Sequence, residues 1–325
     1  MRAFVARRDA DPRDLVGRIL CHDAGSLRKG HAIRAEDLAL LFRGDEEIHL
    51  LELEGDDVGQ RTAGERIANA IRVPGLLALP IGHRHVLRAT EDGLLEVDAE
   101  ALRRLNEIDG VVVFTPRSGE AVGAGDVVAY AQITRLAIAR DRIEEAERRA
   151  AERPVLSVRP FIPRDAILWR RATQIVEPVR GRLQRYGCRL KHSLPLPERA
   201  PDIREAIETF SDSGATLFLI CGSNALDPLD PVFAALEQVG ATMRCSGIPV
   251  HPGTLLWIAT LRDITIVGFP PCGLRGEVSA FDLVLPRLLA GVPLEDLAAL
   301  GHGGLLSRSR VRPFAEEEAV IDAIR

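Results

Sequence analysis

Short apolar runs alternate with amphipathic segments of helical length through the second half of the chain. The apolar runs have the length of buried strands and are bounded by turn-forming residues; they span 165–170, 188–194, 215–221, 255–259 and 264–268. The amphipathic segments carry apolar side chains three and four residues apart, as helices do; they span 177–186, 202–210, 231–239 and 280–291. Such alternation predicts an α/β fold with a doubly wound, mostly parallel sheet and helices on both faces.

The first half of the chain follows no regular alternation. Its expected helices and strands are mixed; they span 55–71, 77–88, 98–109, 111–115 and 127–133. Residues 139–152 are nearly all helix formers with Glu and Arg three or four apart, which predicts a solvated connecting helix that Pro154 ends. The predicted organisation has four parts: a mixed α+β region with small β modules at 1–138, a connecting helix at 139–153, an α/β domain at 154–306, and a C-terminal tail with a short helix at 307–325.

Composition excludes several classes of protein. The net charge is −5 and the basic residues are scattered, whereas nucleic-acid binders need clustered Lys and Arg. No apolar run approaches the ~20 residues of a membrane-spanning helix. The five cysteines form no Cys-x-x-Cys pair, which fits a reducing compartment better than a disulfide framework. We therefore expect a cytoplasmic protein that binds neither nucleic acid nor membrane.

Three loops rich in Gly, Pro, Ser, Asn and Asp follow predicted strands, at 222–230, 247–254 and 269–276. In an open α/β sheet such loops gather at one edge and form the ligand crevice. Small residues in the first loop let backbone N–H groups approach a ligand, and the helix that begins at Pro231 favours an anion at its N-terminus. The same residue types are also common in ordinary turns. Together the three loops predict a small-molecule site.

The order of these loops resembles the molybdopterin-binding (MoeA/MogA-like) family of molybdenum-cofactor biosynthesis. That family has a Gly-Gly-Val-Ser-type loop with an acidic residue, then a Gly-x-x-x-x-Pro-Gly turn, then a Leu-Pro-Gly-Asn-Pro-like loop. The corresponding segments here are Gly222-Ser-Asn, Gly247-Ile-Pro-Val-His-Pro-Gly253 and Phe269-Pro-Pro-Cys-Gly273. The next segment, Ala280-Phe-Asp-Leu-Val-Leu-Pro-Arg-Leu-Leu-Ala-Gly291, is similar to the last helix of a divergent subgroup, some members of which are fused to a nucleotidyltransferase.

The resemblance implies that the three loops hold molybdopterin or its adenylylated form. The cofactor-binding residues that it implies are Gly222, Ser223, Asn224, His251, Pro252, Gly253, Thr254, Pro270, Cys272, Gly273 and Arg275. Arg275 is the cation of this cluster and the expected partner of the pterin phosphate. Cys272 stands where the family usually carries Asn.

Asp227 and Asp230 are the candidate catalytic residues and the candidate metal ligands. A carboxylate accepts N–H bonds from an aminopterin edge or binds Mg²⁺ as an oxygen ligand. Asp230 precedes Pro231 at a helix start, so it is also a good helix N-cap for structural reasons alone. Asp227 is also explained as a turn residue. Both interpretations stay open for both residues.

The resemblance implies a molybdopterin-binding protein of cofactor biosynthesis or delivery. An enzymatic version would be a transferase that inserts molybdate, but His251 and Thr254 stand where such relatives carry lysines, and 167–178 lacks their Gly-Asp-Glu. Whether the chain is catalytic therefore stays open. The alternative is a non-catalytic docking partner or chaperone of a nucleotidyltransferase or a molybdoenzyme, with a degenerate pocket. Related folds also lead us to expect a homo-oligomer.

Overall fold

The computed structural model describes residues 1–41, 47–82, 84–171, 173–271, 278–297, 300 and 304–305. The chain divides into two compact units, Met1–Pro160 (unit 1) and Phe161–Arg325 (unit 2). Each unit has its own buried apolar clusters. Within the described ranges, no helix has both the length and the apolar character needed to cross a membrane.

Unit 1 begins with a small antiparallel sheet and two 3₁₀ helices. The strands, in spatial order, are β1 (Arg2–Arg7), β3 (Glu47–Glu52) and β2 (Ile19–Leu20). The 3₁₀ helices are η1 (Pro12–Leu15) and η2 (Ala35–Leu40). Leu15, Leu20 and Ile33 are buried and belong to a separate small core.

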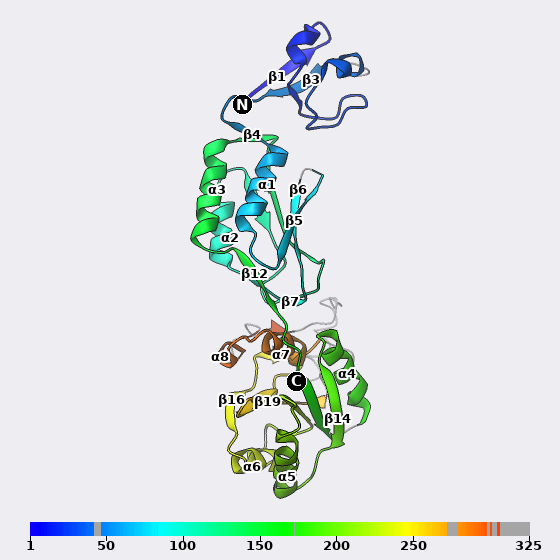
Figure 1. Ribbon diagram of the computed structural model, residues 1–325, viewed down its shortest axis with the longest axis vertical. Coiled ribbons are helices and arrows are strands. Elements are labelled where there is room, and N and C mark those ends of the chain that lie inside the picture. Colours follow the sequence, from blue (N-terminus) through cyan, green and yellow to red (C-terminus); the bar gives the residue numbers. More distant parts are fainter. Residues whose placement is uncertain are drawn as a thin grey trace, which may run out of the picture. The chain divides into compact units, whose positions relative to one another are not determined.

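The larger part of unit 1 is a four-stranded antiparallel sheet against which three helices pack (Figure 1). The strands, in spatial order, are β5 (Leu76–Ile81), β6 (Arg84–Ala89), β10 (Val127–Ile133) and β8 (Val111–Phe114). The helices are α1 (Gln60–Ile71), α2 (Ala99–Asn106) and α3 (Arg140–Glu152). Two smaller sheets complete the unit: β4 (Asp57–Gly59) with β11 (Ala137–Ala139), and β12 (Leu156–Pro160) with β7 (Gly93–Val97) and β9 (Ala121–Val122).

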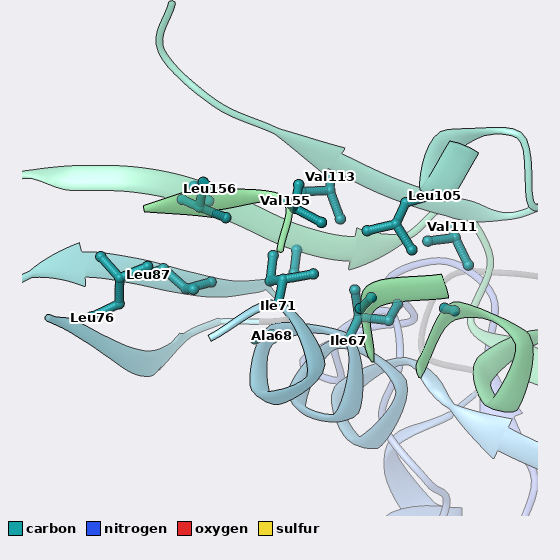
Figure 2. Packing of buried hydrophobic residues seen from close by; sticks show 14 of the residues in the cluster. Ile67, Ala68, Ile71, Leu76, Leu87, Leu105, Val111, Val113, Val155 and Leu156 are labelled. Carbon is teal, nitrogen blue, oxygen red and sulfur yellow. The ribbon is translucent and has the colours of Figure 1, made fainter. Parts of the chain in front are cut away.

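Side chains from helices and strands share one core in this part of unit 1. Figure 2 shows Ile67 and Ile71 of α1 pointing into the same core as Leu105 of α2 and Val111 of β8. All four are at most 2% exposed. Burial of one such side chain stabilises the fold by ~1.5–3 kcal/mol relative to leaving it in water, so the amphipathic face of α1 is a main contributor.

Unit 1 corrects four expectations from the sequence. The strand expected at 77–88 is a hairpin of β5 and β6, because Gly82 (φ +62°) turns the chain between them. The helix expected to begin at 55 begins at Gln60, because Asp57–Gly59 pairs with β11 instead.

The third correction concerns α3. It is not a solvated connector, because Ile143 and Ala146 are buried in the core and Glu147 pairs with Arg66 of α1 at 2.7 Å. The fourth correction concerns the domain boundary. Residues 156–160 were assigned from the sequence to the α/β domain, but they pair as β12 with β7 and lie in unit 1.

Unit 2 contains one six-stranded mixed sheet. The strands, in spatial order, are β14 (Arg189–Pro195), β13 (Asp165–Arg170), β15 (Leu217–Cys221), β19 (Ile264–Phe269), β18 (Trp257–Leu261) and β16 (Thr242–Ser246). The first four strands are parallel, and the last two pairings are antiparallel. The expected mostly parallel sheet is thus only partly present. A two-residue connection between Leu261 and Ile264 forces the antiparallel hairpin, since parallel neighbours need a long crossover.

Helices pack on both faces of this sheet. Successive residues of a strand point to opposite faces, so the apolar side chains of one strand contribute to both packed layers. Leu217 and Leu219 of β15 join a cluster with α4 and α7, whereas Phe218 and Ile220 join a second cluster with α5 and α6. The helices are α4 (Val176–Arg185), α5 (Ala200–Ser211), α6 (Pro231–Gln238), α7 (Ala280–Leu289) and α8 (Leu294–Leu297), with the 3₁₀ helix η3 at Thr173–Ile175. The short pair β17 (Val250–His251) and β20 (Gly304–Leu305) is parallel. The helix expected at 315–324 lies outside the described residues.

Candidate functional site

The three loops singled out in the sequence leave the same edge of the unit 2 sheet. Cys221, the last residue of β15, lies opposite Arg170 of β13 and Phe269 of β19, which end those strands. Trp257, the first residue of the antiparallel β18, lies opposite Gly268 and opposite Ser246, the last residue of β16. Segments 171–175, 222–230, 247–256 and 270–279 therefore all start or end at this edge, which we call the carboxyl edge.

The first loop is anchored at its start by two contacts, one from Arg171 just after β13 and one from Trp257 of β18. Gly222 has φ +104°, and a Cβ there would lie 2.9 Å from the side chain of Arg171. Arg171 donates from Nε to the Gly222 carbonyl at 2.8 Å. Ser223 Oγ accepts a hydrogen bond of 3.0 Å from Nε1 of Trp257, which is otherwise buried. The backbone N–H groups of Ser223 and Ala225 donate to no described residue.

Asp230 organises the rest of the first loop. It is 4% exposed and caps α6 through Oδ1, which accepts the Val232 N–H at 2.9 Å. Its Oδ2 accepts the Asn224 N–H at 2.8 Å across the loop. Both carboxylate oxygens thus hold backbone groups. Asp227 is exposed and accepts the Leu229 N–H at 2.9 Å in a local turn.

The second loop packs onto the start of α7. Gly253 has φ +108°, and a Cβ there would lie 2.7 Å from Cβ of Ala280, so only glycine fits. The Pro252 carbonyl accepts the Ala280 N–H at 2.9 Å. The Thr254 hydroxyl donates to the Val250 carbonyl at 2.9 Å, so it is held within the loop. The exposed imidazole of His251 is the ionisable side chain of residues 247–254.

A buried cysteine lies near the end of β16, just before the second loop. Cys245 donates from Sγ to the Gly247 carbonyl at 3.3 Å. Burial raises the pKa of the Cys245 thiol, so it is protonated at neutral pH and serves as a small buried residue.

The third loop is described only at its two ends. Pro270 directly follows the buried Phe269, whereas the predicted ligand residues Cys272, Gly273 and Arg275 lie outside the described residues. After the loop, Asp282 accepts the Ser279 N–H at 2.8 Å and pairs with Arg182 of α4 at 2.6 Å. These contacts fix the first turn of α7 and attach it to α4.

The first loop is attached to its neighbours, Arg171 and Trp257 of β18, through contacts that the sequence does not announce. The sequence assigned no role to Trp257, although an indole N–H in a buried strand normally requires an acceptor, and that requirement was a usable signal. The contact of Arg171 with Gly222 was also missed from the sequence.

Metal binding at this edge stays a prediction. Among the described residues, no group of three or more His, Cys, Asp or Glu side chains is placed to hold a metal ion. Asp227 and Asp230 are two carboxylates, and hard cations such as Mg²⁺ usually take one or two protein carboxylates plus water and phosphate oxygens. The assignment of Mg²⁺ and molybdate to these residues is therefore neither supported nor contradicted.

No protein-family model matches the chain, and neither does any curated protein. Among solved structures, it is similar to the molybdopterin biosynthesis enzyme MoaB from Thermus thermophilus, with 18% identity, 42% of this chain and 98% of that chain covered, and a TM-score of 0.33. It is also similar to a molybdopterin biosynthesis MoeA protein from Pyrococcus horikoshii, with 13% identity, 93% of this chain and 76% of that chain covered, and a TM-score of 0.29. A third similar structure is a molybdenum cofactor biosynthesis protein from Pyrococcus furiosus, with 17% identity, 62% of this chain and 65% of that chain covered, and a TM-score of 0.27. Identities and TM-scores this low assign no activity to the chain.

Proposed function

We propose that unit 2 binds molybdopterin or its adenylylated form, and that the chain acts in molybdenum-cofactor biosynthesis or delivery. One observation supports this most directly: the loops at 222–230 and 247–256, whose motifs resemble the family, leave one edge of a single sheet. Ligands of open α/β sheets bind at that edge. The proposal therefore joins a motif order in the sequence to a site geometry that is typical of the fold class.

The first loop suits the anionic part of such a ligand. The N–H groups of Ser223 and Ala225 remain available as donors, and the terminal nitrogens of Arg171 bond no described residue. Backbone donors beside a guanidinium bind phosphate well, because they combine directed hydrogen bonds with full charge. We assign the pterin phosphate to this loop, together with Arg275 as proposed from the sequence.

Binding rather than turnover is the function that we propose. Both oxygens of Asp230 hold backbone N–H groups, so a metal ion at Asp230 would compete with the cap of α6. Molybdate insertion would then depend on Asp227, which is exposed beside it in the loop. The lysines that accompany this activity in the family are replaced by His251 and Thr254.

The test is anaerobic calorimetric titration of the protein with molybdopterin. We expect saturable binding that weakens at least tenfold in Arg171→Gln and in Arg275→Ala, which is about 1.4 kcal/mol. Arg204→Gln is the matched control, because Arg204 lies on α5 and its one ion pair with a described residue is with Glu208 at 3.5 Å. If the unaltered protein shows no binding, or if the control weakens binding as much, the pterin assignment is wrong.

A docking role is the second candidate, and one observation favours it. Leu226 and Leu229, in the same first loop, are 74% and 86% exposed. Large apolar side chains so exposed beside a candidate ligand site are typical of a surface that a partner protein covers. In this version the chain is a non-catalytic partner of a nucleotidyltransferase or a molybdoenzyme. Leu226→Ser with Leu229→Ser would then abolish co-purification with that enzyme and leave the affinity for molybdopterin unchanged.

A further inference from the structure

His85 of β6 is a buried polar side chain that no described residue satisfies. It is 5% exposed, and its Nδ1 is fully buried without a hydrogen-bond partner among the described residues. Buried polar atoms in native proteins nearly always have partners, and the exceptions mark bound water, ligands or functional sites. A leucine or phenylalanine would fill the same place without leaving a polar atom unpaired.

His85 lines a cavity of about 250 Å³ between α1 and the β5–β6 hairpin. Arg61, Glu65 and Asn69 line the same cavity, and their spacing of four residues places them on one face of α1. Arg61 and Glu65 form no ion pair with each other, so both charges remain available to a ligand. Burial is the main cause that lowers the pKa of His85; Glu65 raises this pKa and Arg61 lowers it, both by less. The imidazole is therefore neutral and has one donor and one acceptor nitrogen.

A second, larger cavity of about 530 Å³ shares Arg61 with the first and surrounds the N-terminus of α1. Lys29 and the backbone of Gly30 line it together with Gly59, Gln60 and Thr62. The N–H groups of Arg61 and Thr62 donate to no described residue, and no described side chain caps this helix. A helix N-terminus with two neighbouring cations favours an anion, and phosphate groups above all.

We propose that these two cavities form one binding site for a phosphate monoester of a small polar molecule, about the size of a nucleotide. The phosphate lies against Lys29, Arg61 and the first N–H groups of α1. The hydroxyl or heterocyclic part lies over His85, where Glu65 accepts from its donors and Asn69 supplies both donor and acceptor. The larger cavity alone falls within the ~300–1,000 Å³ of small-molecule sites. This site lies wholly in unit 1 and does not depend on the function proposed for unit 2.

The experiment is NMR of the histidine ring nitrogens in the full chain, titrated with guanosine 5′-monophosphate and, separately, with ribose 5-phosphate. His85→Phe identifies the His85 signals by their loss. We expect a saturable shift of those signals with at least one ester. Arg61→Gln should weaken that binding at least tenfold, whereas Arg72→Gln, an exposed arginine at the other end of α1, should leave it unchanged.

Inorganic phosphate is the discriminating probe, because it occupies the anion end alone. Weaker binding of phosphate than of the ester, by tenfold or more, supports a site that extends to His85. Equal binding of both would overturn the proposal, since His85 would then contribute nothing. No shift with either ester up to about 10 mM also overturns it, because affinities weaker than that are not specific recognition. The thermal unfolding midpoint of His85→Phe serves as the folding control. If it equals or exceeds that of the unaltered protein, any loss of binding is not caused by a loss of folding.

Discussion

Replacement of Asp230 by alanine separates the two interpretations of this residue. In the structure its two oxygens accept N–H groups of Val232 and Asn224 at 2.9 and 2.8 Å, and the side chain is 4% exposed. Loss of an N-cap costs about 0.5–2 kcal/mol. A hydrogen bond to a charged group contributes about 1.5–3 kcal/mol, although the Asn224 N–H can regain water once the carboxylate is gone. We therefore expect Asp230→Ala to lower the free energy of unfolding by about 2–4 kcal/mol.

Urea unfolding followed by tryptophan fluorescence measures this loss. Both tryptophans of the chain, Trp169 and Trp257, lie in unit 2, so their emission reports the unit that contains Asp230. The unfolding midpoint should fall without a change in the slope, which would show a change of stability rather than of compactness. Asp230→Asn should lose about 1 kcal/mol, because the amide keeps one acceptor oxygen.

Asp227→Ala is the matched control for this measurement. Its carboxylate is exposed and accepts the Leu229 N–H in a local turn, so its loss should cost less than about 1 kcal/mol. A midpoint for Asp230→Ala equal to that of the unaltered protein would refute the assignment of this carboxylate as a cap. Such a result, combined with loss of molybdopterin binding, would return Asp230 to the ligand site as a metal or pterin contact.

Three further substitutions test other parts of the structure. Gly253→Ala should destabilise unit 2 by about 2–5 kcal/mol in the same assay, because the left-handed backbone costs ~1–2 kcal/mol and the clash with the start of α7 costs a further ~1–3 kcal/mol. Gly291→Ala, where φ is also positive but nothing lies within 4 Å, should lose only the backbone part. Equal losses in the two variants would contradict the proposed packing of Gly253 against α7. Gly268→Ala should displace the indole of Trp257, whose ring atoms lie as close as 1.9 Å to the added Cβ, and near-ultraviolet circular dichroism should lose the Trp257 signal; an unchanged spectrum would count against this contact. Burial lowers the pKa of His85 in the folded chain, so the unfolded chain takes up a proton first as pH falls through the ordinary value of 6.5. The stability of unit 1 should therefore fall with decreasing pH below about 7.5 and level off below the folded pKa, and His85→Phe should remove that part of the pH dependence; parallel pH profiles of the two proteins would show the inference to be wrong.

Local signals explain which elements the sequence predicts well. The start and end of α6 follow from Asp230, Pro231 and Gly240, because capping depends on residues within one turn of the helix. The buried strand β15 follows from an uninterrupted apolar run. The hairpin at Gly82 was missed, since apolar residues on both sides of the turn make two short strands look like a single long one.

The site was predictable in outline but not in its contacts. Strand ends and turn residues suffice to expect that several loops share an edge. The bonds from Arg171 to Gly222 and from Trp257 to Ser223 join residues 51 and 34 positions apart, and no local pattern specifies such pairs. The packing of Gly253 against Ala280 joins residues on either side of the β18–β19 hairpin, and no local pattern specifies such a contact either.

The first loop keeps its shape mainly through main-chain groups, and this has an evolutionary consequence. Gly222 and Asp230 hold its two ends by bonds to or from the backbone, whereas Leu226, Asp227 and Leu229 are exposed to solvent. Substitutions at those three exposed positions leave the anchoring bonds in place. Selection for loop shape alone would let them drift, so a side-chain motif would fade from the sequence long before the amide geometry changed.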